Sequence, residues 1–153
     1  MFDKEMFKEY CKQPEKLEKF VKKFEKKSLA KKSAPDVWSG KEIIGHLADC
    51  EQVYGMRFRL ALAETGMYFQ PFDQEMWVEN LKHQNREVKD LVESFKALRD
   101  DNAELLKSIG EKDWDQFGMH PAAGKLTVHA IVKRLTDHFE SHLKQVEKRA
   151  GKS

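Results

Sequence analysis

Four segments of the sequence carry apolar residues at helical spacing, and this pattern limits what the chain can fold into. The apolar positions recur at intervals of three and four residues over 17–24, 43–62, 77–105 and 131–146. Such spacing places apolar side chains on one face of an α-helix. Four amphipathic helices in one chain bury these faces against one another, so we predict an all-α fold built as a four-helix bundle.

The second of these helices has the clearest predicted boundaries. Ser39 followed by Glu42 is the pattern of a capping box, and Trp38 and Ile43 stand at the two positions of a hydrophobic staple. Gly66 follows the apolar stripe and suits the left-handed residue that ends many helices. We therefore expect a helix between Ser39 and Gly66.

Similar signals predict the other three helices. Pro14 suits the first position of a helix, so we expect the first long helix to begin near it, after a segment that can itself be a short lead-in helix. Asp73 and Thr127 are N-cap residues for the third and fourth helices. The third helix would cover residues 73–109 and be roughly 54 Å long. At that length we expect a kink or a protruding end.

The composition agrees with a helical domain. Of the 153 residues, 35% are charged, compared with about a quarter in ordinary domains, and this suits helices with wide solvated faces. Strand-forming residues are scarce, which argues against a β-rich fold. We expect one domain over residues 1–153, with a lead-in segment at 1–13 and a frayed tail at 150–153.

Charge and apolar runs argue against several partners and locations. No apolar run is long enough to cross a membrane, and the first residues lack the apolar region of a signal peptide. Two cysteines, Cys11 and Cys50, make no disulfide framework. The net charge of +2 gives no electrostatic reason to bind nucleic acid. We therefore expect a cytoplasmic protein that binds neither membranes nor nucleic acids.

Three of the six histidines fall on predicted inward faces. His138 and His142 lie one turn apart on the apolar stripe of the fourth helix. His46 lies about 9 Å after the start of the second helix, and His142 about 9 Å before the end of the fourth. If these helices run antiparallel, the three imidazoles reach one level of the bundle. Three histidine ligands leave a metal with an open position for water or substrate.

The sequence leaves alternatives open around these histidines. All three can instead be core histidines with satisfied hydrogen bonds. Cys50, one turn after His46, is either a fourth ligand or a small buried apolar residue. Asp49 either accepts a hydrogen bond from an imidazole or is an exposed acid. We expect Arg57 to form an ion pair at the edge of the core.

The remaining histidines suggest no chemistry. We expect His83 and His129 on the surface and His120 in a loop. Residues 138–142 read His-Phe-Glu-Ser-His, which is not the His-Glu-x-x-His motif of zinc proteases. No histidine follows a glutamate by three residues, so a di-iron carboxylate centre is also excluded.

Four blocks of the sequence together resemble the DinB/YfiT-like superfamily. They lie at residues 38–49, 72–77, 120–127 and 138–142, and the first reads WSGKEIIGHLAD. The resemblance covers nearly the whole chain from about residue 14. It implies a four-helix bundle with a three-histidine site for a divalent metal. In this chain the three ligands would be His46, His138 and His142.

The resemblance also implies a range of activities. Characterised relatives include transferases and isomerases that use low-molecular-weight thiols such as bacillithiol or mycothiol, and domains of sulfur-insertion enzymes with iron. We expect a metal-dependent enzyme, a thiol transferase or a hydrolase, that acts on a small molecule and holds one divalent metal, either zinc or nickel, or else iron. No catalytic base is identifiable. The alternative is a non-catalytic bundle that binds a small molecule or forms a homodimer and keeps a structural or vestigial metal.

Overall fold

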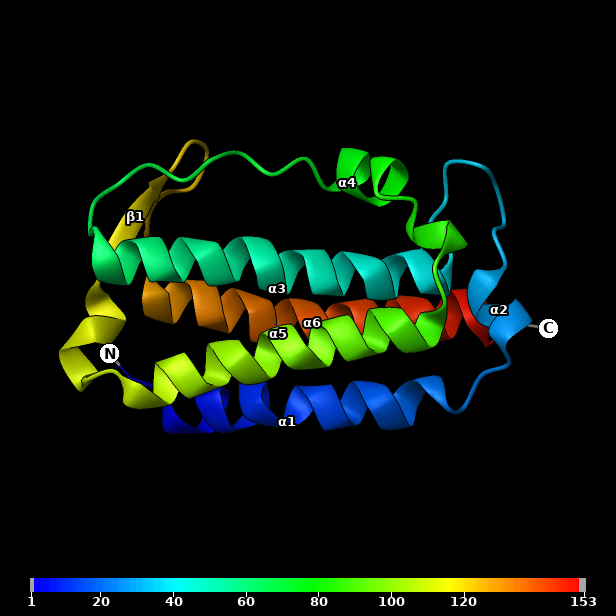
Figure 1. Cartoon of the computed structure of the whole chain (residues 1–153), viewed down its shortest axis with the longest axis horizontal. Coiled ribbons are helices and arrows are strands. Elements are labelled where there is room, and N and C mark those ends of the chain that lie inside the picture. The colour runs from blue at the N-terminus through cyan, green and yellow to red at the C-terminus, as the bar shows by residue number, and fades with distance from the viewer. Residues whose placement is uncertain (1, 152–153) are drawn as a thin grey trace.

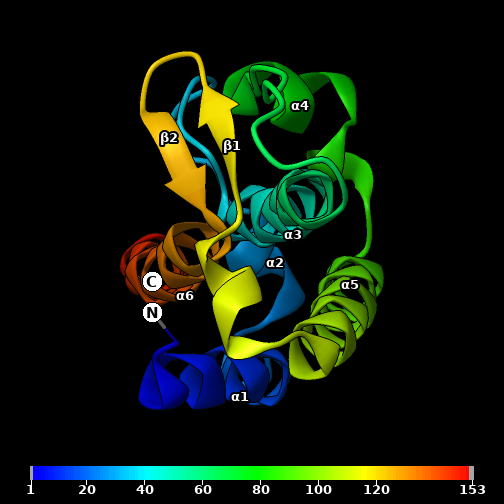
Figure 2. The same cartoon turned by 90° about the vertical axis from the view of Figure 1, so that its left-hand side faces the viewer.

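Four long helices packed side by side form the body of the protein, here a computed structural model that describes residues 2–151. They are α1 (Lys4–Val21), α3 (Gly40–Ala63), α5 (Val88–Ser108) and α6 (Val128–Ala150) (Figure 1). The helices α3 and α1 each pack against both α5 and α6 (Figure 2). The predicted four-helix bundle is confirmed. The helices α3 and α6 run antiparallel, and both span the length of the bundle (Figure 1).

Shorter elements join these helices. They are α2 (Lys26–Ala30), α4 (Gln74–Asn80), the 3₁₀ helices η1 (His83–Asn85) and η2 (Glu111–Asp115), and the strands β1 (Phe117–His120) and β2 (Gly124–Thr127). The two strands pair antiparallel as a hairpin, which the scarcity of strand-forming residues did not predict. Within residues 2–151 no helix combines the length and apolar character needed to cross a membrane.

The predicted N-caps are present. The Ser39 hydroxyl accepts a hydrogen bond from the backbone N–H of Glu42, and the Glu42 carboxylate accepts one from Ser39 N–H. Asp73 and Thr127 likewise cap α4 and α6. Gly66 has the expected positive φ of 88°, two residues beyond the last capping position of α3. These signals each depend on residues within one turn, so local sequence is enough to predict them.

The first long helix begins at Lys4, so the prediction that it begins near Pro14 was wrong. Pro14 lies inside α1, where a proline normally costs about 3 kcal/mol because it removes a backbone N–H. The carbonyl that this N–H would have bonded is that of Tyr10, four residues earlier. It accepts a hydrogen bond from the buried guanidinium of Arg99 instead, at 2.8 Å. The bundle therefore satisfies the carbonyl that the proline leaves free.

The predicted third helix is broken into α4, η1 and α5. Lys82 has a left-handed backbone with φ of 56°, and Leu81 is half exposed although the apolar stripe placed it inward. His83 takes the buried position instead and packs on α3 at Gly45, where an added Cβ would lie 2.5 Å from the imidazole. A tertiary contact thus overrides the helical pattern.

The C-terminal part of α6 is ordered by packing. Ala150, which was predicted to fray, is buried in the core at the end of α6, so this prediction was wrong for Ala150. Gly151 caps the helix. Residues 152–153 lie outside the described part of the chain.

A buried polar network joins the four long helices. Arg99 on α5 and Glu51 on α3 are each 1% exposed and form an ion pair of 2.7 Å. The second Glu51 oxygen accepts hydrogen bonds from the Tyr10 hydroxyl of α1 and from the Asn102 amide. Gln13 of α1 accepts from Arg99 and donates to a backbone carbonyl of α6. The network fixes the rotation of each helix relative to the others.

We expect Glu51→Gln to lower the free energy of unfolding by about 3–5 kcal/mol, because it leaves the Arg99 charge buried without a counterion. Urea unfolding measures the effect. The matched control is Glu18→Gln, which removes the exposed partner of Lys96 and should change stability little or not at all. Equal effects of the two substitutions would contradict the role given to the buried pair.

Candidate metal centre

The three histidines that the sequence singled out lie together between α3 and α6. The ring centroids of His138 and His142 are 4.1 Å apart, as expected for neighbours one turn apart on α6. His46 comes from the antiparallel α3, with its ring centroid 5.5 Å from that of His138 and 4.8 Å from that of His142. His46 is fully buried, His142 is nearly so, and His138 is partly exposed.

Gln145, which sequence reasoning missed, orients one of these imidazoles. The Nδ1 atom of His142 lies 2.8 Å from the Gln145 amide oxygen, and its Nε2 atom lies 2.9 Å from His138 Nε2. An amide oxygen can only accept, so Nδ1 carries the proton and Nε2 presents its lone pair to His138. The signal available in the sequence was the spacing of three residues on the same helix face as His142.

Cys50 brings a sulfur atom into the same cluster. Its Sγ lies 3.5 Å from Nε2 and 3.8 Å from Nδ1 of His46. Among residues 2–151, the group whose potential ligand atoms all lie within 4.8 Å of one another consists of His46, Cys50 and His138. Burial first, and then the charges of Glu51 and Asp49, raise the pKa of the Cys50 thiol well above its usual range.

Burial keeps the imidazoles uncharged at neutral pH. It lowers the pKa of His46 to about 3, with help from the charges of His142, His138 and His83. It lowers the pKa of His138 to about 4, with help from His142 and Arg134. Burial also lowers the pKa of His142, although the hydrogen bond to Gln145 opposes the shift. Neutral imidazole is the form that binds a metal.

These residues fit a divalent transition metal. Two imidazole nitrogens on one metal, with bonds of about 2.0–2.1 Å, stand about 3–3.4 Å apart. The 2.9 Å between the Nε2 atoms of His138 and His142 is close to that range. Uncharged nitrogen donors with a neighbouring sulfur are the donor set that suits zinc, nickel or iron rather than calcium or magnesium.

Aromatic side chains enclose one side of the cluster. The Trp38 ring lies 4.9 Å from the His46 imidazole, and Phe72 stacks on it at 6.5 Å. Trp77 packs edge-on against Phe72. His138, by contrast, borders a shallow depression on the outer face of α6. The side of the cluster at His138 is therefore the one nearest to solvent.

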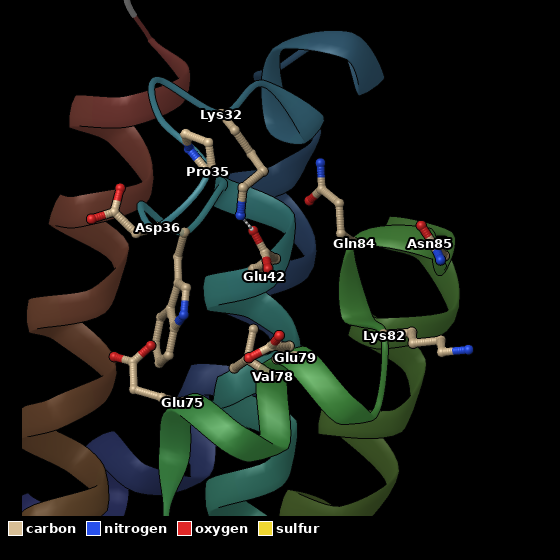
Figure 3. A pocket seen from close by; sticks show the side chains of 11 residues that line it. Lys32, Pro35, Asp36, Glu42, Glu75, Val78, Glu79, Lys82, Gln84 and Asn85 are labelled. Carbon is tan, nitrogen blue, oxygen red and sulfur yellow. Dashed lines mark hydrogen bonds and ion pairs between the residues drawn. The ribbon is translucent and has the colours of Figure 1, made fainter.

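Trp38 also borders a polar depression of about 520 Å³ (Figure 3). Lys32 donates a hydrogen bond to Glu42 within it, and Glu75 and Glu79 line it from α4. Because the Trp38 ring also contacts His46, this side chain connects the depression with the imidazoles.

Asp49 and His83 pair with each other away from these ligand atoms. His83 Nε2 donates a hydrogen bond of 2.7 Å to the Asp49 carboxylate, and both side chains are buried. The prediction of a surface position for His83 was wrong, because the segment that carries it folds back onto Gly45. Asp49 is not an exposed acid either. It accepts a hydrogen bond from an imidazole, but from His83 rather than from His46.

The other singled-out residues lie apart from the cluster. His129 is half-buried at the start of α6. His120 ends β1, where its Nδ1 accepts hydrogen bonds from two backbone N–H groups of the hairpin turn. Arg57 is buried and donates to the Gln70 carbonyl, and its guanidinium lies over the Tyr54 ring at 4.9 Å. The Arg57 guanidinium therefore contacts a backbone carbonyl and an aromatic ring instead of the carboxylate that we expected.

Comparison with known proteins finds relatives whose names refer to metal-dependent hydrolysis. A sequence profile described as the DinB superfamily matches residues 9–146. Two proteins of Oceanobacillus iheyensis are each 25% identical to this chain, over 71% and 78% of it and over 63% and 68% of their own lengths. A Bacillus cereus protein is 25% identical over 84% of this chain and 74% of its own. All three are provisionally named metal-dependent hydrolases. The match spans less than two thirds of the first relative's length.

A solved structure has the same fold. It is YfiT from Bacillus subtilis, described as a probable metal-dependent hydrolase with an unusual four-helix bundle topology. The two structures superpose with a TM-score of 0.86 at 20% sequence identity. The superposition covers 100% of this chain and 92% of the YfiT chain. At this identity the likeness establishes the fold.

We expect the chain to bind one equivalent of zinc, and His46→Ala, His138→Ala and His142→Ala each to abolish stoichiometric binding. Elemental analysis after dialysis measures the occupancy. His129→Ala is the control and should retain the metal, because His129 lies apart from the cluster. Full occupancy after His138→Ala would show that the ligands lie elsewhere.

The metal-free chain should lose stability as the pH falls from about 6.5 towards 4. Over this range the unfolded chain takes up protons on imidazoles of ordinary pKa near 6.5, whereas the buried imidazoles of the folded chain do not. The His46→Gln variant lacks one such group, so its stability should fall less steeply. Urea unfolding at a series of pH values measures both slopes. Equal slopes would contradict the depressed pKa of His46.

Proposed function

The chain belongs to the DinB superfamily, and from that premise we propose that it is a metal-dependent enzyme that holds one divalent transition metal through His46, His138 and His142. The observation that carries the proposal is the meeting of three uncharged imidazoles from two antiparallel helices. Core histidines would need a hydrogen-bond partner for each ring nitrogen. In this cluster the partners of the ring nitrogens include other potential metal ligands, since His142 Nε2 pairs with His138 Nε2 and His46 contacts Cys50 Sγ.

Zinc or nickel is the proposed metal, with iron as the third choice, because imidazole nitrogen is a good donor for each of these ions. A divalent ion held there would supply Lewis acidity and would lower the pKa of a water or thiol that it coordinates. The protein's own residues prepare this site. Gln145 holds His142 in one tautomer, and Trp38 and Phe72 keep water away from His46.

Hydrolysis of a small molecule is the reaction that the names of the relatives support. Transfer to a low-molecular-weight thiol is the second candidate. The observation that favours it is the Cys50 sulfur 3.5 Å from His46 Nε2, which indicates that there is room for a sulfur atom beside the imidazoles. Both reactions need a substrate to reach the ligands, and the partly exposed His138 marks the approach.

We expect metal-dependent turnover when the zinc- or nickel-loaded chain is offered a panel of small esters, amides and electrophiles, with and without cysteine, glutathione or bacillithiol. Mass spectrometry identifies the products. Turnover without thiol supports hydrolysis, whereas a product that contains the thiol supports transfer. His138→Ala should abolish either activity, and His129→Ala should not.

The absence of turnover would also decide between the enzymatic and the non-catalytic function. A chain that binds metal at full stoichiometry but turns over nothing in the panel, with or without thiol, would favour the non-catalytic alternative over an enzyme.

A further inference from the structure

Arg57 is a buried cation that no carboxylate among residues 2–151 neutralises. Its side chain is 4% exposed, and its contacts are with a backbone carbonyl and with aromatic rings. Arg99, which is also buried, pairs with the Glu51 carboxylate at 2.7 Å. A charge removed from water normally needs such a partner. Arg57 therefore lacks the counterion that the burial of its charge requires.

Three contacts hold the Arg57 guanidinium in place. It donates a hydrogen bond of 2.8 Å to the Gln70 carbonyl, and it lies 4.9 Å from the centre of the Tyr54 ring and 5.7 Å from that of Phe69. Its Nε atom has no hydrogen-bond partner within the described residues. The side chain is thus fixed in position while one of its donors remains unused.

Arg134 is a second arginine for which residues 2–151 provide no ion pair, and it lies beside the metal centre. It is exposed on α6 one turn before His138, and both side chains line the same depression. The neighbouring Asp137 already pairs with Lys133 at 2.6 Å. The positive charge of Arg134 next to His138 is therefore not neutralised by the carboxylate nearest to it in the sequence.

The two arginines act on the same neighbours. Burial lowers the pKa of the His120 imidazole, and the charges of Arg57 and Arg134 lower it further. Burial also lowers the pKa of Arg57, the Tyr54 hydroxyl opposes this shift, and the charge of Arg134 adds to it. His120 ends β1, and the hairpin lies over α3 and α6 on the side of the bundle away from α1 (Figure 2). Arg57 on α3 and Arg134 on α6 thus lie close to each other beneath this hairpin.

We propose that Arg57 and Arg134 bind a carboxylate of the substrate beside His138, so that the substrate is a small carboxylic acid whose other end reaches the metal. This rests on the proposed function, because the metal acts on the same molecule. The planar guanidinium binds a carboxylate through two parallel hydrogen bonds. A carboxylate carries one charge and is easier to remove from water than a phosphate, which suits the buried Arg57.

The test uses metal-binding probes that differ only in the charge at their far end. The monohydroxamate of succinic acid carries a hydroxamate, which binds zinc, and a free carboxylate, whereas its amide analogue has nearly the same shape without the charge. The malonic and glutaric pairs vary the distance between the two ends. Titration calorimetry on the zinc-loaded full chain measures the affinities. For at least one length we expect the acid to bind at least about tenfold more tightly than the amide.

Arg57→Gln and Arg134→Gln should each reduce this preference for the acid by at least about threefold. Arg59→Gln is the matched control, because it removes the same charge from α3 on the side where Arg59 pairs with Asp101 of α5. It should leave the preference unchanged. Circular dichroism checks that each variant is folded. If Arg57→Gln is not, Arg57→Lys, which keeps the charge but loses the planar fork, should still weaken the preference.

The outcomes separate this inference from the proposed function. Equal affinities for acid and amide at all three lengths, or no binding of either by the zinc-loaded chain, would overturn the inference and leave the metal centre in place. A preference for the acid that both arginine variants retain would also overturn it. Failure of the unmodified chain to take up zinc would overturn the proposed function, and this inference with it.

Discussion

The buried ion pair between Glu51 and Arg99 is the constraint on which the arrangement of the bundle depends. Two charges that are almost completely removed from water must face each other, and each must also satisfy its remaining hydrogen bonds. Here the partners come from α1, α3 and α5, and Gln13 extends the network to α6. Apolar faces alone permit helices to rotate or slide, whereas this ion pair and its hydrogen bonds form at one rotation of each helix.

The same constraint places the imidazole cluster. Glu51 directly follows Cys50, and successive residues of a helix point about 100° apart. When Glu51 faces Arg99, Cys50 and His46 are turned towards α6, where His138 and His142 lie. The polar network and the imidazole cluster therefore lie on two faces of the same helix, α3. A similar dependence holds at η1, where the buried pair of His83 and Asp49 ties the segment after α4 to α3.

Prediction from sequence succeeded where the deciding signals are local and failed where they are distant. The caps at Ser39, Asp73 and Thr127 depend on neighbours within one turn, and the meeting of the three histidines needed only regular spacing on two antiparallel helices. The break at Lys82 depends on His83 reaching Asp49, 34 residues away. Sequence reasoning missed Gln145 and left two readings of Cys50 open, although each lies one turn from a histidine of its own helix, because spacing shows which residues share a face but not which of their atoms make contact.

The hydrogen bond from Arg99 to the carbonyl of Tyr10 has a consequence for how this sequence can change over time. Pro14 leaves that carbonyl without its helical partner, and Arg99, 89 residues away, supplies the replacement. Loss of Arg99 alone would leave a buried carbonyl unpaired beside a proline. Replacement of Pro14 alone would return a backbone N–H donor to that carbonyl, so that Arg99 would no longer be its sole replacement partner. The two positions are therefore epistatic, and an evolutionary path that alters one is expected to pass through compensating change at the other.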